Sequence, residues 1–140
     1  MTPMSRRRPI RYLAVAAALL SSIVLGGCGG SDTPAVCSAV DALQTSVEDI
    51  VDKDINLDSL STLDDDLGQV RADLADVKSA AEDEYAAEVD AVDQAATSAR
   101  SSLSAAMDSP SAQTVAAVGT AVKSLGTALT ALRDAVQSTC

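Results

Sequence analysis

The chain has 140 residues, of which 47% are hydrophobic, and it carries 20 acidic against 10 basic side chains, a formal net charge of −10. It contains no histidine, phenylalanine or tryptophan. Without histidine, Ser–His–Asp triads and histidine-containing metal sites are excluded. Beyond residue 28 the chain has no basic patch and only one aromatic residue, Tyr85, on which bases could stack, so nucleic acid is not an expected partner.

The first 27 residues have the three zones of a secretory leader. Four arginines precede an apolar stretch over residues 12–25, and two small residues, Gly26 and Gly27, follow that stretch. A helix of about 14 residues rises only about 21 Å, short of the roughly 30 Å hydrocarbon core of a membrane. We therefore expect residues 1–27 to be a cleaved signal peptide and not a transmembrane helix. Arg6 and Arg7 also resemble a twin-arginine signal, so both export routes stay open.

The leader ends in Leu25, Gly26, Gly27 and Cys28, which resembles the lipobox of bacterial lipoproteins. The resemblance implies that cleavage leaves Cys28 first in the mature chain, carrying covalent diacylglycerol and fatty acid such as palmitate. The protein would then be anchored at the extracytoplasmic face of the cell membrane. An ordinary secretory signal cut elsewhere is the alternative. The mature chain retains six basic and all 20 acidic residues, a net charge of −14, which disfavours anionic lipid head groups as partners.

The mature part is predicted to be one all-α domain behind a short tether. Residues 28–33 are rich in glycine and serine and are typical of a flexible tether. From residue 34 apolar residues recur every three or four positions, which predicts a first helix over about 34–52. Thr33 is the expected N-cap, with Pro34 at the first helical position.

An acidic connector follows the first helix. Asp52, Asp54, Asn56 and Asp58 stand at the alternating spacing of a calcium-binding EF-hand loop, where hard oxygen ligands wrap one ion. Two positions depart from that pattern, since Leu57 replaces the expected glycine and Leu63 replaces the final glutamate. The alternative is a plain connector in which Asn56 turns the chain and Asp58 or Ser59 caps the next helix.

A long apolar seam then runs over about 59–107, with alternating steps of three and four residues as in a coiled coil. The step from Ala81 to Tyr85 is four where three is due, which is a stutter. It indicates either a continuous, kinked helix or a break at residues 82–85. Since no glycine or proline lies nearby, the sequence favours the continuous helix.

The last predicted helix covers about 110–138. Ser109 is the expected cap and Pro110 the first helical residue. Gly119 and Gly126 lie seven residues apart on one face, which suggests close approach of a neighbouring helix. Together the patterns predict an antiparallel, coiled-coil-like bundle of three or four helices within residues 34–140.

Two cysteines follow Cys28, namely Cys37 and Cys140. An exported compartment permits disulfides, and an even pair suggests one bridge. Both the three- and the four-helix topology allow the two positions to meet, so we predict a Cys37–Cys140 disulfide. A pair of free thiols is the alternative.

The lipobox, the Ala/Asp/Val-rich helices and the terminal Cys140 together resemble the small lipoproteins of high-GC Gram-positive bacteria. That resemblance implies a membrane location and a helical fold but no defined activity. We expect a non-enzymatic envelope protein that contacts another protein or a wall component. The alternative is a module that binds a small ligand or an ion such as calcium, at the 52–58 connector or in an interhelical groove.

Overall fold

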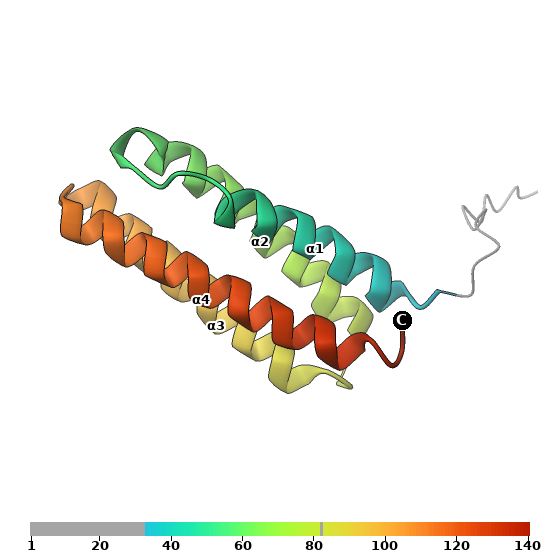
Figure 1. The fold of residues 1–140 in the computed structure, drawn as a ribbon. Helices are drawn as coiled ribbons and strands as arrows, with labels where there is room; N and C mark the ends of the chain where they lie inside the picture. Colours follow the sequence, from blue (N-terminus) through green and yellow to red (C-terminus); the bar gives the residue numbers. More distant parts are fainter. Residues whose placement is uncertain (1–32, 82) are drawn as a thin grey trace, which may run out of the picture. The chain divides into compact units, whose positions relative to one another are not determined.

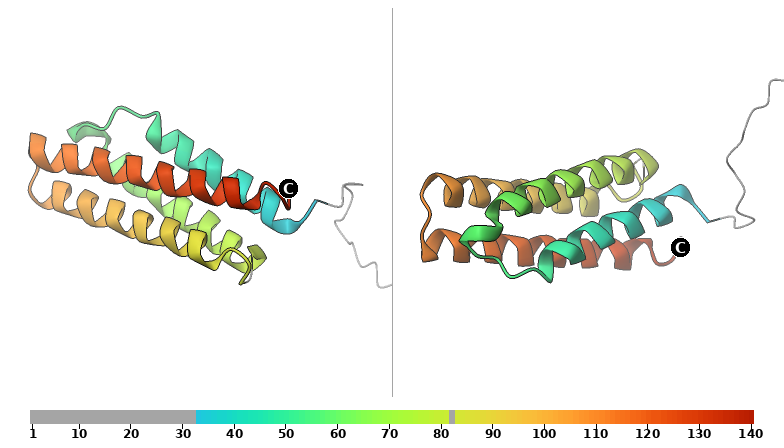
Figure 2. Two further views of the ribbon diagram at one scale, coloured as in Figure 1. Left: turned by 60° about the horizontal axis from the view of Figure 1, so that its bottom comes forward. Right: turned by 90° about the horizontal axis from the view of Figure 1, so that it is seen from above.

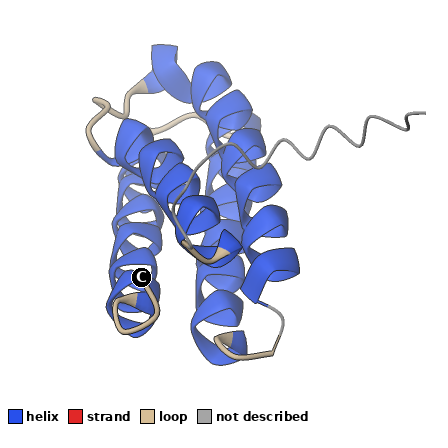
Figure 3. Cartoon of the chain, turned by 90° about the vertical axis from the view of Figure 1, so that its right-hand side faces the viewer, coloured by secondary structure: helices blue, strands red, loops and turns tan. Residues whose placement is uncertain are grey.

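The computed structural model describes residues 33–81 and 83–140. The leader, the lipobox-like tetrad with Cys28, and Glu82 lie outside the described residues. Within them the helices are α1 (Ala35–Val51), the short 3₁₀ helix η1 (Leu57–Ser59), α2 (Leu60–Ala81), α3 (Ala86–Asp108) and α4 (Ala112–Val136). The described segments are helices and loops with no strand among them (Figures 1 and 3), which confirms the predicted all-α bundle and makes it four-helical.

The four helices run alternately up and down. Each helix packs against its neighbour in the chain, and α4 returns to pack against α1, which closes the bundle. Two ends result, as Figures 1 and 2 show. The proximal end holds the start of α1, the turn between α2 and α3, and the C-terminus. The distal end holds the α1–α2 connector (52–59) and the α3–α4 connector (109–111).

The core is apolar throughout. Each helix contributes one stripe of buried residues, and Tyr85 adds the only aromatic side chain among them; no polar or charged residue of the described part is buried. The stripe of α3 includes the small residues Ala96, Ala99 and Ala106, which let α3 and α4 approach closely. A buried valine or leucine contributes roughly 1.5–3 kcal/mol and an alanine much less, so this core is thin for its size.

The predicted continuous helix over 59–107 is wrong, because the chain turns between Ala81 and Ala86. The backbone N–H of Glu84 donates to the carbonyl of Ala81 (3.2 Å), and that of Val89 donates to the carbonyl of Tyr85 (2.9 Å). Tyr85 has φ −118° and ψ 28°, a conformation open to any residue, so the turn needs neither glycine nor proline. The stutter coincides with the break. Ala81 is buried at the end of α2, and Tyr85 is buried just before the start of α3.

The expected caps also differ from the observed ones. Pro34, not Thr33, is the N-cap of α1, and no side chain caps that end. Helix α4 begins at Ala112, not at Pro110, because Ser111 is its N-cap. The Ser111 hydroxyl accepts from the Thr114 N–H (3.1 Å), and the Thr114 hydroxyl accepts from the Ser111 N–H (3.0 Å). This reciprocal pair satisfies two backbone donors at the start of α4.

The two glycines of α4 behave differently. A Cβ added at Gly126 would lie 3.4 Å from Cγ2 of Val51 on α1, so the expected close approach occurs there. A Cβ added at Gly119 would meet nothing within 4 Å, so the same expectation is wrong at that position. Gly119 lies nearer the distal end, where no neighbouring helix lies close to this face of α4.

Of the described helices, α4 is the one long and apolar enough to span a membrane by length and composition. The mean hydropathy of its most apolar window is 1.4, and one third of that window is buried. Its only charged residues are Lys123, Arg133 and Asp134, so α4 bears a net positive charge whereas α1, α2 and α3 are each acidic. The surface of α4 is therefore chemically distinct from that of the other three helices.

Candidate functional site

A disulfide joins Cys37 to Cys140 at the proximal end, which is the pairing expected from the sequence. The two Cα atoms lie 5.7 Å apart although 103 residues separate them in the chain. Cys37 belongs to the first turn of α1, and the Cys140 N–H donates to the Val136 carbonyl (2.9 Å) just beyond α4. The bridge thus links the first and the last helix covalently.

Tyr85 ties a third segment to the same end. Its hydroxyl forms a hydrogen bond with that of Thr139, 54 residues away and next to Cys140. Its ring is buried in the core, with 7% of the residue exposed. The α2–α3 turn, the C-terminus and the start of α1 are therefore held together by bonds between distant parts of the chain.

The α1–α2 connector is organised by Asn56. The side-chain oxygen of Asn56 accepts hydrogen bonds from the N–H groups of Asp58 (3.0 Å) and Ser59 (3.2 Å). The Ser59 hydroxyl in turn accepts from the Asn56 N–H (3.0 Å). This reciprocal arrangement caps η1, which leads directly into α2. Asn56, not Asp58 or Ser59, is thus the capping residue.

The structure does not bring the four calcium candidates together. Asp52, Asp54 and Asp58 are exposed, and the oxygen of Asn56 is already committed to two backbone donors. Over residues 33–81 and 83–140, no group of three or more potential metal-ligating acidic or cysteine side chains is close enough to hold an ion. The connector, as it stands, is a capped turn with outward-facing carboxylates.

The acidic residues at 64–66 of α2 and at 83–84 also lie at least partly on the surface. Asp64 and Asp66 in α2 form ion pairs with Arg100 of α3 and Lys53 of the connector. A third pair joins Lys78 of α2 to Asp93 of α3. These residues are partly exposed, so each pair contributes little to stability, between about 0 and 1 kcal/mol. Asp83 and Glu84 lie exposed in the α2–α3 turn.

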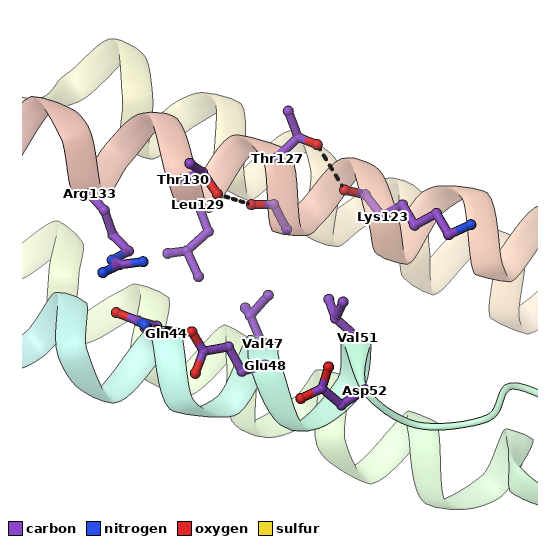
Figure 4. Close-up of a pocket in the computed structure, with 11 residues that line it drawn as sticks. Gln44, Val47, Glu48, Val51, Asp52, Lys123, Thr127, Leu129, Thr130 and Arg133 are labelled. Atoms are coloured by element: carbon purple, nitrogen blue, oxygen red, sulfur yellow. Dashed lines mark hydrogen bonds between the residues drawn. The ribbon is translucent and has the colours of Figure 1, made fainter.

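A groove of about 410 Å³ runs between α1 and α4. In Figure 4 the side chains of Val47 and Val51 on α1 and Leu129 on α4 point into the space between the two helices. Gly126 opens the wall on the α4 side because it has no side chain. Polar and charged residues form the two rims, so the groove has an apolar floor and a polar edge.

The two rims differ in charge. The α4 rim carries Lys123 and Arg133, and the α1 rim carries Glu48 and Asp52. No ion pair crosses the groove, since the three ion pairs of the described residues lie elsewhere. Both cations of α4 are therefore available to a molecule that enters the groove. The sequence analysis allowed for an interhelical groove but did not predict which helices form it, because the groove depends on the spacing of helices that are distant in the chain.

Comparison of the chain with models of protein families, with curated proteins and with solved structures found no match.

Proposed function

We propose that residues 28–140 form a lipid-tethered, extracytoplasmic helical bundle that binds another envelope protein or a wall component and catalyses no reaction. The leader and the Leu25–Cys28 tetrad support the tethering. The observation that carries the location is the Cys37–Cys140 bridge, because disulfides form and persist in oxidising compartments outside the cytosol. The leader and the bridge both support export.

The tether would set how the bundle is presented. The seven residues from Cys28 to Pro34 reach at most about 25 Å even when fully extended. Helix α4, with 25 residues, is about 37 Å long. The proximal end would therefore stay near the membrane, and the sides and the distal end of the bundle would face the wall. Amphipathic bundles of this kind usually act through their surfaces.

Crosslinking with mass spectrometry in the native cell tests this proposal, and Cys28→Ala provides the control. We expect wild-type protein in the membrane fraction, with crosslinks to at least one other envelope component. The Cys28→Ala variant should carry no lipid, which mass spectrometry of the peptide around residue 28 measures. Wild-type protein without lipid on Cys28 would contradict lipid tethering, and wild-type protein without any crosslink to another molecule would contradict the binding role.

The α1–α4 groove supports a second candidate function, the binding of a small ligand. Its volume of about 410 Å³ lies within the range of small-molecule sites, and its apolar floor with charged rims is typical of them. A thermal-shift screen of small charged molecules would test it, since a ligand that binds only the folded state raises the melting temperature.

A matched pair of variants makes that screen specific. Thr130 lines the groove, whereas Thr120 on the same helix does not, and each hydroxyl bonds to a carbonyl four residues earlier. A ligand shift that disappears in Thr130→Phe and persists in Thr120→Phe would support binding in the groove. A shift that survives in both variants would exclude the groove as its origin.

A further inference from the structure

Two of the three large exposed hydrophobic residues of the described chain lie at the distal end. They are Leu57 (55% exposed) in η1 and Met107 (49%) near the end of α3, whereas Val51 (43%) lies beside Gly126 of α4 and lines the α1–α4 groove. The described residues of the proximal end include no large exposed hydrophobic residue. Single exposed apolar residues are normal on a protein surface, but two that line the same hollow from separate segments indicate an interaction surface.

Two of these residues frame a hollow. Leu57 and Met107, together with Leu60, Ser61 and Pro110, line a depression of about 300 Å³. Leu60 is 5% exposed and belongs to the core, so the hollow has a fixed apolar floor. Met107 is unbranched and polarisable, and such side chains adapt to varied apolar partners. We call Leu57, Leu60, Met107 and Pro110 the tip patch.

Carboxylates lie in the same segments as the tip patch. Asp54 lies three residues before Leu57, Asp58 directly follows it, and Asp108 follows Met107. All three are exposed, and none takes part in the ion pairs of the described residues. The cation of the same connector, Lys53, is paired with Asp66. The tip patch is therefore an apolar hollow accompanied by uncompensated negative charge.

We infer that the tip patch binds a segment of a partner protein that presents an apolar side chain between lysine or arginine residues. This inference rests on the proposed function and specifies the chemistry of its partner. Charge complementarity favours a basic partner segment, because the two alternatives would bring like charges together. A second copy of the chain would bring the same carboxylates to the contact, and an anionic lipid surface would be repelled in the same way.

Site-specific photocrosslinking in the native cell, with the full-length chain, tests the inference. A photoreactive phenylalanine analogue replaces Leu57 in the tip patch, Thr127 on the rim of the α1–α4 groove, or Glu84 at the proximal end. We expect position 57 to capture a partner protein at a peptide with lysine or arginine within a few residues of the crosslinked one. Position 84 should not capture that peptide.

Charge-neutral variants supply the second arm. Asp58→Asn combined with Asp108→Asn should lower the crosslinking yield from position 57 by about threefold or more, since each rim charge contributes a few tenths to 1 kcal/mol. The matched control, Asp83→Asn with Glu84→Gln, removes two exposed charges at the proximal end and should leave the yield unchanged. None of these four side chains forms an ion pair in the described structure.

The possible failures are distinguishable. Capture from position 127 but not from position 57 would overturn the tip-patch inference and leave the proposed binding role intact. Capture of a second copy, capture of a segment without basic residues, or equal loss of yield in both charge variants would overturn the inference in the same way. No capture from any of the three positions would overturn both the inference and the proposed binding role.

Discussion

The two ends of the bundle are held together in different ways. At the proximal end, bonds between distant parts of the chain join α1, the α2–α3 turn and the C-terminus: the Cys37–Cys140 disulfide and the hydrogen bond between Tyr85 and Thr139. At the distal end each connector is organised mainly by its own residues, through the caps at Asn56 and Ser111. Among the described residues, the exposed Leu57 and Met107 lie at the second of these ends, and the first has no large exposed hydrophobic residue.

This difference indicates that the proximal end contributes mainly to stability and the distal end mainly to binding. A thin core of valine, leucine and alanine gains from a covalent link that restricts the unfolded chain. With the proximal end fixed in this way, the distal end retains apolar residues on its surface that the core does not need. We therefore expect substitutions at the proximal end to change stability and substitutions at the distal end to change binding.

Removal of the disulfide should have the largest effect. Cys37→Ser with Cys140→Ser opens a loop of 103 residues in the unfolded state. The chain-entropy relation for a loop of about 100 residues gives a loss of about 4.7 kcal/mol in the free energy of unfolding. Urea unfolding followed by circular dichroism measures it. Reductant should destabilise the wild type similarly and leave the double variant unchanged; a loss below about 1 kcal/mol would contradict the role given to the bridge.

The second proximal contact should matter less. Tyr85→Phe keeps the buried ring and removes only the hydroxyl that bonds with Thr139, which should lower the free energy of unfolding by about 1 kcal/mol. A double-mutant cycle with Thr139→Val isolates the contact. If the two single losses simply add in the double variant, the hydrogen bond does not join this turn to the C-terminus.

The looser packing in the distal half of α4 can be tested through its glycines. Gly119→Ala should raise the free energy of unfolding by about 0.5–1 kcal/mol, because alanine favours the helix and its methyl group meets no neighbour within 4 Å. Gly126→Ala should gain less, since its methyl group would lie 3.4 Å from Val51. Thermal unfolding of both variants gives the comparison. A larger gain at Gly126 would contradict the difference in packing.

Polar substitutions in the tip patch should change stability least among the variants. Leu57→Ser and Met107→Ser replace side chains that are about half exposed, so each should alter the free energy of unfolding by no more than about 0.5 kcal/mol. Chemical denaturation measures this effect. A loss of 2 kcal/mol or more would mean that these residues serve the fold, and that their exposure does not indicate a binding surface.

We expect the α1–α2 connector not to bind calcium. The Asn56 oxygen is occupied by two backbone donors, and Asp52, Asp54 and Asp58 do not form a cluster able to hold an ion. We expect no heat of binding by calorimetry at millimolar calcium and no shift in melting temperature. Binding that is lost in Asp54→Asn would restore the connector as a calcium site.

The sequence predicted the helical content, the registers of the apolar stripes and the pairing of Cys37 with Cys140. These depend on periodicity and on which end of a helix a residue occupies, and both can be read along the chain. It did not predict the break at Tyr85, because no glycine or proline marks that turn. What stabilises the turn is burial of the Tyr85 ring and a bond to Thr139, 54 residues away.

The sequence by itself therefore determined an all-α, histidine-free, acidic bundle and the residues that fill its core. Only the tertiary structure decided that residues 33–81 and 83–140 form a bundle of four α-helices, that a groove opens between α1 and α4, and that Leu57 and Met107 share one hollow. The reason is physical. Local pattern fixes which face of a helix is buried, whereas the spacing of helices and the surfaces left exposed depend on contacts between residues far apart in the chain.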